Sequence, residues 1–180
     1  VARGAPNAEP PKLARGSKVA ILEGIPTAFN AQQRRLGFED AMREAGMTVV
    51  SVQSAHWEQD EANTIAAALL REHPDLAAIL ASNDNMALGA AAAVRQASRV
   101  GAVAVVGFDH IAAVQQLLKE GRIAATAAQH GDKLAVYGIE YVLGILKGET
   151  TPQDRQTPVR PGTELRNRGD GLVYSTESTL

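Results

Sequence analysis

The chain has 180 residues and a formal net charge of −2; 45% of its residues are hydrophobic and only 4% are aromatic. This composition indicates one globular domain rather than a disordered segment, and the absence of a basic stripe argues against nucleic acid as a partner. No apolar run approaches the roughly 18 residues of a membrane span, so no membrane insertion is expected. The lack of cysteine excludes a disulfide framework or a thiolate metal site.

Short apolar runs alternate with helical patterns along the chain. The predicted strands cover 18–22, 47–53, 76–81, 102–107 and 123–128. The predicted helices cover 30–45, 59–73, 84–97, 110–120 and 133–146. This alternation predicts right-handed βαβ units, and therefore an α/β three-layer sandwich around a doubly wound parallel sheet of about five strands.

The two ends of the chain differ from its middle. Residues 1–17 are rich in proline and glycine and lack apolar periodicity, which predicts an N-terminal arm or linker. Residues 160–180 are charged and glycine-rich, and we expect a loose tail with one weak strand candidate at 172–174. Between them, residues 18–159 are predicted to form the single α/β domain.

Local signals suggest how individual helices begin and which side they bury. Asn30 is expected to cap the first helix and Asp132 the last, because a short polar side chain can accept from the first free backbone N–H groups. The inner face of the first helix is predicted to carry Phe38, Ala41 and Met42.

Polar side chains gather where the predicted strands end. In a doubly wound sheet the loops after the strands converge on one edge, where open α/β sheets bind their ligands. Amides and carboxylates can donate to and accept from adjacent hydroxyls while an aromatic ring covers a C–H face, so this mixture suits a sugar. The residues so placed are Glu23, Asn30, Gln32, Arg34, Trp57, Asn83, Asp84, Asp109, His110 and Gln129.

Several of these residues have a structural alternative. Asn83 and Asp84 lie between a strand and a helix, so either can cap that helix; we favour the cap for Asp84 and ligand binding for Asn83. Asp109 is equally consistent with an N-cap and with a ligand contact. Trp57 lies in a polar loop, which favours an exposed platform over a plug at the end of the core.

The remaining polar residues form no catalytic constellation. Gln129 alone is also consistent with a turn residue, and Arg34 and Arg35 with a solvated helix face. The sequence has no G-x-S-x-G, P-loop or G-x-G-x-x-G pattern, and no nucleophile lies beside a base. The four histidines lack metal-ligand spacing, and a metal or general-base role for the three near the edge stays a minor alternative. No enzymatic activity, cofactor or metal is therefore expected.

Four stretches recur in the order that is typical of one family. They are HPDLAAILASNDNMALGAAAAV, VAVVGFD, LLKEGRIAATAAQ and LKGE. In this order they resemble the type I periplasmic sugar-binding proteins, of the ribose-binding kind, from about residue 18 to residue 159. The related effector-binding domains of LacI-type repressors share parts of the pattern.

This resemblance implies a function and a set of contacts. The family binds a monosaccharide between two lobes that close on it and delivers the sugar to an ABC importer, so a sugar and an ABC permease are the implied partners. By motif, Asn83, Asp109 and Gln129 match residues that hydrogen-bond the sugar from the second lobe. Trp57 matches an aromatic residue that packs on the sugar ring. Gln32 falls where a ribose-type protein has an arginine, and Asn30 or Arg34 is the candidate to compensate for this departure.

The resemblance covers only the second of the family's two lobes. In the family, the helix that corresponds to 133–147 crosses back and packs on the first lobe, so its apolar side would lack a host here. Burying one Leu or Ile is worth about 1.5–3 kcal/mol, which makes a bare apolar stripe costly. We expect this helix to fold back on its own sheet, to dock on the missing first lobe or another chain, or to form a homodimer. The implied location is periplasmic or extracytoplasmic, although no signal peptide is visible in this chain.

Two other classes of function remain open. The chain could be the effector-binding domain of a LacI-type regulator or the input half of a sensor, although no helix-turn-helix precedes residue 18. An enzyme of flavodoxin-like shape would require turnover or a bound cofactor. A neighbouring ABC permease would favour transport, whereas a DNA-binding domain encoded upstream would favour regulation.

Overall fold

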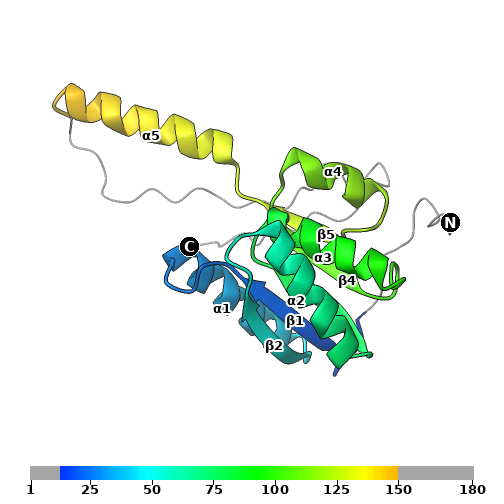
Figure 1. The fold of residues 1–180 in the computed structure, drawn as a ribbon. Coiled ribbons are helices and arrows are strands. Elements are labelled where there is room, and N and C mark those ends of the chain that lie inside the picture. Colours follow the sequence, from blue (N-terminus) through cyan, green and yellow to red (C-terminus); the bar gives the residue numbers. More distant parts are fainter. Residues whose placement is uncertain (1–12, 150–180) are drawn as a thin grey trace.

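The computed structural model describes residues 13–149 of the chain. The strands are β1 (Lys18–Glu23), β2 (Thr48–Ser54), β3 (Leu76–Ala81), β4 (Ala104–Asp109) and β5 (Ala125–Ala128). The helices are α1 (Phe29–Glu44), α2 (Gln59–Glu72), α3 (Asp84–Gln96), α4 (Ala112–Lys119) and α5 (Gly131–Leu146). The five strands form one parallel sheet in the order β2-β1-β3-β4-β5, which confirms the predicted doubly wound α/β fold (Figure 1).

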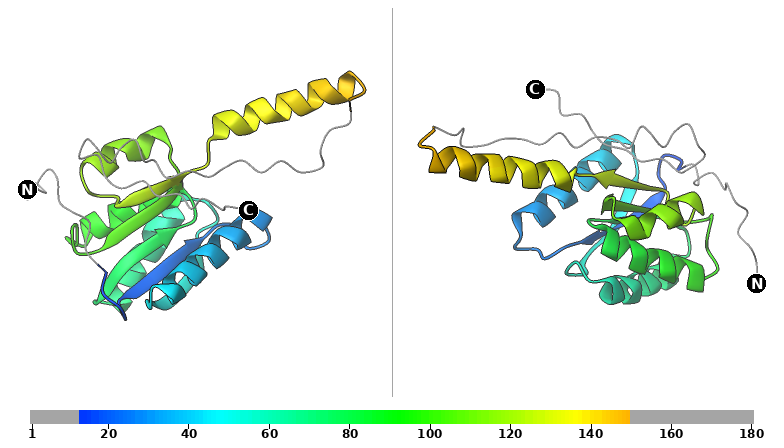
Figure 2. Two further views of the ribbon diagram at one scale, coloured as in Figure 1. Left: turned by 180° about the vertical axis from the view of Figure 1, so that it is seen from behind. Right: turned by 90° about the horizontal axis from the view of Figure 1, so that it is seen from above.

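The helices cover the two faces of the sheet unequally. Side chains from α2, α3 and α4 pack together with one face of the strands in the larger core, whereas α1 contributes Met42 to a much smaller cluster on the other face. The three layers expected from the sequence are therefore present, but only one of the two interfaces is extensive (Figure 2).

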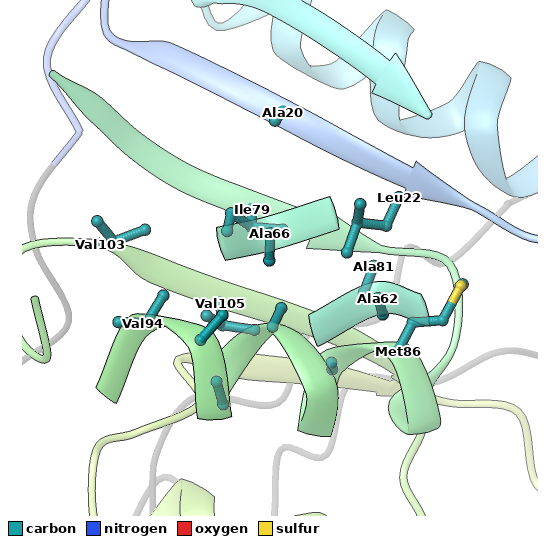
Figure 3. Close-up of a cluster of buried hydrophobic side chains, with 14 of the residues drawn as sticks. Ala20, Leu22, Ala62, Ala66, Ile79, Ala81, Met86, Val94, Val103 and Val105 are labelled. Carbon is teal, nitrogen blue, oxygen red and sulfur yellow. The ribbon is translucent and has the colours of Figure 1, made fainter. Parts of the chain in front are cut away.

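The larger core lies between the sheet and the α2–α3 layer. Alternate strand residues face it, including Leu22 of β1, Ile79 of β3 and Val105 of β4, and each is at most 1% exposed (Figure 3). Successive strand side chains point to opposite faces, so this alternation selects every second residue. Helix α3 meets these residues with small side chains such as Ala90, which lets its backbone lie close to the sheet.

Close packing of α2 against α3 depends on Gly89. A Cβ at this position would overlap the backbone carbonyl of Gln59 and lie 2.9 Å from the amide nitrogen of Asn63. The side-chain amide of Asn63 donates to the Gly89 carbonyl at 3.0 Å, so a polar contact joins the two helices where they are closest.

Some local expectations need correction. Helix α1 has Ala28 as its N-cap, and Asn30 is already inside the helix because Phe29 has helical geometry. Ala41 is exposed rather than on the inner face. Helix α5 starts after His130, which adopts a left-handed conformation (φ 50°), so Asp132 lies in the first turn rather than at the cap.

The N-terminal boundary also differs from the prediction. Leu13 packs against the smaller cluster, and the Gly16 amide donates to the Gly46 carbonyl at 2.7 Å. Residues 13–17 therefore belong to the fold and not to a free arm. The remainder of the predicted arm (1–12), the predicted tail (160–180) and its strand candidate at 172–174 lie outside the described residues.

Helix α5 projects away from the sheet instead of folding back on it (Figures 1 and 2). Folding back was one of the three expected outcomes, and the structure does not show it. Large apolar side chains along α5 are 43–78% exposed; they are Leu134, Val136, Ile139, Val142, Leu143, Ile145 and Leu146. Despite this apolar surface, no helix among residues 13–149 combines the length and hydropathy needed to cross a membrane.

Candidate ligand-binding site

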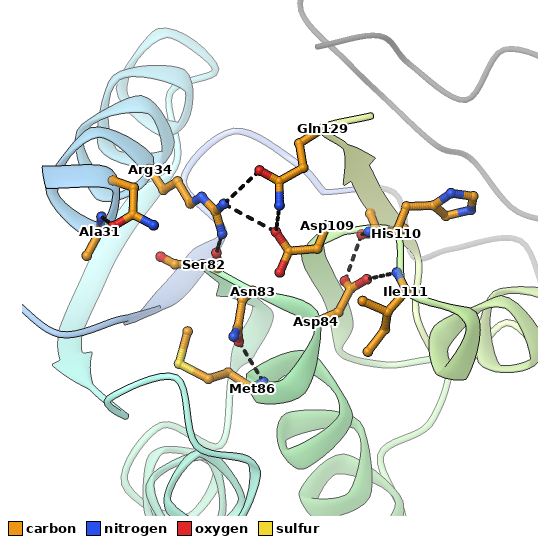
Figure 4. A network of polar contacts seen from close by, with 12 residues as sticks. Ala31, Arg34, Ser82, Asn83, Asp84, Met86, Asp109, His110, Ile111 and Gln129 are labelled. Atoms are coloured by element: carbon orange, nitrogen blue, oxygen red, sulfur yellow. Dashed lines mark hydrogen bonds and ion pairs between the residues drawn. The ribbon is translucent and has the colours of Figure 1, made fainter. Parts of the chain in front are cut away.

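Polar side chains from four parts of the chain meet at the carboxyl edge of the sheet (Figure 4). Gln129, which follows β5, donates its amide Nε2 to Oδ1 of Asp109 at the end of β4, at 2.7 Å. Arg34 of α1 lies 3.2 Å from the same Asp109 oxygen and donates to Oε1 of Gln129 at 3.4 Å. We call Arg34, Asp109 and Gln129 the edge cluster; Asn83, which follows β3, lies beside it.

Arg34 is the centre of the edge cluster. Its side chain is only 13% exposed, and Nη1 donates to the Ser82 carbonyl at 2.7 Å. Its guanidinium carbon lies 4.0 Å from the centre of the Phe108 ring, within the range of a cation–π contact. Burial lowers the pKa of Arg34, and the charge of Asp109 opposes that shift. The alternative of a solvated helix face is therefore wrong for Arg34.

Asp109 is held in the edge cluster by its backbone as well as its partners. It has a φ of 111°, which directs the chain after β4 across the sheet edge, and its side chain is 22% exposed. The N-cap of α4 is Ile111, so the N-cap alternative for Asp109 is wrong. Burial raises the pKa of the Asp109 carboxyl, and the neighbouring Arg34 charge limits this rise.

The expected cap at Asp84 is wrong, because Asn83 caps α3; ligand binding by Asn83 stays a prediction. Asn83 is the N-cap of α3, because its Oδ1 accepts from the Met86 amide at 2.9 Å. Its Nδ2 donates to no other group among residues 13–149 in the hydrogen bonds of the structure, which leaves that amide free to face a ligand. Asp84 lies inside the helix and is fully buried.

Asp84 ties together the loops that carry the edge cluster. Its Oδ1 accepts from the hydroxyl of Thr126 in β5 at 2.7 Å, and its Oδ2 accepts from the Ile111 amide at 2.8 Å. Thr126 in turn accepts from the His110 amide at 3.3 Å. Burial raises the pKa of Asp84 to about 6, because the two hydrogen bonds offset only part of the lost hydration.

Gly107 allows this arrangement. A Cβ at Gly107 would overlap the Asp84 carboxylate and lie 3.0 Å from the Ala87 side chain. The absence of a side chain in β4 at this point therefore lets α3 bring its buried carboxylate against the strand.

Trp57 is partly buried rather than fully exposed. It packs against the larger core, and its indole lies over Gly24, where a Cβ would overlap the ring. The ring centre is 5.5 Å from the Arg34 guanidinium carbon. Trp57 thus closes the end of the core and borders the edge cluster at the same time; its ring-stacking role stays a prediction.

Asn30 and Gln32 do not join the edge cluster. Asn30 Oδ1 accepts from the neighbouring Ala31 amide at 3.1 Å, and Gln32 Nε2 donates to the Pro26 carbonyl at 2.8 Å. Both side chains are exposed on the first turn of α1, close to the loop after β1. Arg34, one helical turn further, supplies the guanidinium that Gln32 does not.

Left-handed backbone conformations concentrate at this edge. Among the described non-glycine residues, positive φ angles occur in the loops after β2, β4 and β5, and elsewhere only at Ser98; those at the edge are His56, Trp57, Asp109, His110 and His130. Such conformations cost energy in non-glycine residues and often mark ligand sites. The strained loops therefore support a binding role for the edge.

Phe108, Ser82 and Thr126 contribute to the site but were not predicted. Thr126 carried a usable signal, because a hydroxyl inside the apolar run at 123–128 requires a hydrogen-bond partner when buried. Phe108 and the Ser82 carbonyl carried no such signal, because the tertiary fold decides which side chains and carbonyl groups face the site.

Metal binding finds no support in the described part of the chain. Residues 13–149 contain no group of three or more His, Cys, Asp or Glu side chains that could hold an ion. The chemistry of the edge is instead that of hydrogen bonding: one carboxylate, two amides and a guanidinium beside two aromatic rings.

Comparison with known proteins agrees with this chemistry. The family model described as a periplasmic binding protein domain matches residues 7–150. The D-ribose/D-allose-binding protein of Pseudomonas aeruginosa is 51% identical over 154 residues, which are 86% of this chain and 48% of that protein. The ribose import binding protein of Salmonella typhimurium is 37% identical over 138 residues, or 77% of this chain and 46% of that protein.

A solved structure gives the same result. The periplasmic solute-binding protein of an ABC transporter from Actinobacillus succinogenes, with bound D-allose, is 32% identical with a TM-score of 0.75; the match covers 90% of this chain and 50% of that one. The chain thus spans about half the length of the relatives it matches, and these relatives are binding proteins rather than enzymes. By sequence and by fold, the chain belongs to the type I periplasmic sugar-binding proteins.

Proposed function

We propose that the chain is the monosaccharide-binding half of a solute-binding protein that delivers sugar to an ABC importer outside the cytoplasm. The observation that carries this proposal is the edge cluster: Arg34, Asp109 and Gln129 are hydrogen-bonded to one another at the carboxyl edge of the sheet. The ribose and allose named for the relatives make aldoses of this size the first candidates.

The edge cluster offers the groups that a sugar requires. Asp109 can accept from two adjacent hydroxyls, while Arg34 and the free Nδ2 of Asn83 can donate to hydroxyl or ring oxygens. Trp57 and Phe108 provide apolar surface for the C–H face of the ring. Because the three cluster side chains already hold one another, little ordering is needed when a sugar replaces some of these contacts.

A single lobe presents these groups from one side only. A sugar bound there would keep its other side in water, so the isolated lobe should bind weakly unless an opposite wall is supplied. Helix α5, with its exposed apolar side chains, is the element that would join such a wall: either the first lobe of a longer chain or a second copy of this one. Closure of two lobes on the sugar would then be the signal read by a permease.

The test is a substitution at Asp109 in a two-lobe protein. The chain would be joined to the first lobe of the Pseudomonas aeruginosa relative, and ribose and allose binding measured by calorimetry. Asp109→Ala should abolish binding, whereas Asp40→Ala, which removes an exposed carboxylate paired only with Arg43 on α1, should not. Unchanged affinity in Asp109→Ala would refute the proposed site.

A further inference from the structure

Beyond Asp132 in its first turn, helix α5 is apolar on all sides but one. Lys133, Glu140 and Lys147 are spaced by seven residues, so they share one narrow stripe along the helix. The seven large apolar side chains that are 43–78% exposed occupy the remaining surface. A helix that is apolar nearly all round is normally enclosed by protein on several sides, which a single partner helix cannot provide. The host of α5 should therefore be a sheet with neighbouring elements.

The same chain has a sheet face that lacks a helix. On the face opposite α3, α1 packs mainly on β1 and β2. Over β3–β5 no helix of the described residues makes extensive contact with that face, and Val106 and Ala127 remain partly exposed there; at the carboxyl edge the Phe108 ring is covered by Arg34 of α1. The cluster on this face contains only three buried residues, Val19, Ala78 and Ala104. Within residues 13–149, the structure thus combines an apolar helix that leaves the sheet with a sheet face that no helix covers over β3–β5.

We propose that two copies of this chain exchange their α5 helices, each helix covering the β3–β5 face of the other copy. Reciprocal exchange makes the interface two-fold symmetric and closed, the commonest arrangement for homodimers.

The direction of α5 fixes the orientation of the two copies. A helix that packs on a parallel sheet runs antiparallel to the strands, so α5 must approach the other copy at its carboxyl edge. Only Gln129 and His130 separate β5 from α5, which keeps the two carboxyl edges close together and facing each other. A helix of 16 residues spans about 24 Å and a strand of six about 20 Å, so α5 would end near the amino edge of its host.

This orientation deepens the proposed function, on which the following step rests. The edge cluster of one copy would face the edge cluster of the other, so the partner copy supplies the second wall that a single lobe lacks. The sugar site would then be complete only in the dimer.

Analytical ultracentrifugation of the whole chain tests the dimer. We expect a dimer for the unchanged chain and a dissociation constant raised by more than about 100-fold in Ile139→Glu, because a carboxylate would enter the covered face. The matched control is Val52→Glu, at an exposed valine of the edge strand β2, which β1 separates from β3–β5; its dimer should be unchanged. A monomer at all concentrations for the unchanged chain would overturn the proposal.

Cross-linking tests the exchange itself. The chain contains no cysteine, so Leu146→Cys and Ala102→Cys can be prepared separately and mixed. Exchange places the end of α5 near the start of β4 in the other copy, and the mixture should form a disulfide between the two variants. A dimer in which this disulfide does not form, while Ile139→Cys cross-links to itself, would indicate simple helix pairing and overturn the exchange.

Sugar binding separates this proposal from the preceding one. If the dimer forms by exchange but binds no sugar, the proposed function fails and the exchange stands. If the dimer binds sugar, Ile139→Glu should lose that affinity although Ile139 lies outside the edge cluster; a monomeric Ile139→Glu with undiminished affinity would refute a site shared between two copies.

Discussion

Two carboxylates lie close together at the sheet edge and differ in almost every physical respect. Asp84, on the α3 side, is fully buried and accepts from two neutral donors, the Thr126 hydroxyl and the Ile111 amide. Asp109, on the α1 side, is 22% exposed and is paired with the charged Arg34. The edge thus has one buried carboxylate that holds its loops together and one partly exposed carboxylate that can meet a ligand.

This difference shows how the loop after β4 can be held rigidly and still offer a side chain to a ligand. The backbone after β4 is fixed from behind by Asp84 through Ile111 and, through Thr126, by His110. Within residues 13–149, the partners of the Asp109 carboxylate are the side chains of Arg34 and Gln129, which a sugar could replace. Precise ligand binding requires that the side chain contacting the ligand, here Asp109, is supported by a rigid backbone.

The largest expected effect on stability comes from removing the Asp84 carboxylate. Asp84→Ala should lower the free energy of unfolding by about 3–4 kcal/mol, because the buried Thr126 hydroxyl and the partly buried Ile111 amide would be left without an acceptor. Urea denaturation measures this loss, with Asp40→Ala as an exposed control. A loss below about 1 kcal/mol would mean that Asp84 does not hold the edge together.

A pH dependence should distinguish Asp84 from an ordinary surface carboxylate. Its pKa in the folded chain is about 6, above the usual value, so the folded state binds the proton more tightly than the unfolded state. The associated stability is present at low pH and is lost as pH rises from about 4 to 6, by up to about 3 kcal/mol. Asp84→Asn should flatten this part of the stability profile; an unchanged slope would contradict the raised pKa.

Adding one methyl group beside the Asp84 carboxylate should have an intermediate effect. Gly107→Ala would press a Cβ against the Asp84 carboxylate and the Ala87 side chain, which should cost about 2 kcal/mol. In Asp84→Ala much of this cost should disappear, because the overlapping carboxylate is gone. Thermal unfolding of the two single variants and the double variant would measure the coupling, and strict additivity would show that Gly107 is not required by Asp84.

The fold was predictable from the sequence because it depends on periodicity. Runs such as 76–81 are apolar throughout, and helices follow them after short polar turns, so a doubly wound parallel sheet is the only regular solution. Strand ends were less predictable: β4 starts at Ala104 rather than at 102, because the turn at Gly101 continues into the apolar run.

The location of the edge cluster was also predictable, but not the role of each member. Strand-end position brings Asp109 and Gln129 together in any sheet of this topology. The orientation of Arg34 depends on which side of α1 faces β4, and α1 has so few buried residues that the sequence does not reveal it. Asn83 and Asp84 are adjacent, so a shift of one residue in the start of α3 decides which of them caps the helix and which lies inside it.

The smallest effect on stability, and the largest on binding, is expected at Asp109. Asp109→Asn keeps an acceptor for Gln129 and Arg34 and removes a carboxylate whose burial raises its pKa, so the free energy of unfolding should change by less than about 1 kcal/mol. Sugar affinity of the two-lobe or dimeric protein should nevertheless fall by about 100-fold or more, because an amide is uncharged and has one acceptor oxygen in place of two. Arg34→Met is the informative companion, since it leaves Asp109 without its cationic partner and should destabilise the fold more than Asp109→Asn. If Asp109→Asn instead destabilised the fold as much as Asp84→Ala, both carboxylates would be structural, and the assignment of support to Asp84 and of ligand binding to Asp109 would be wrong.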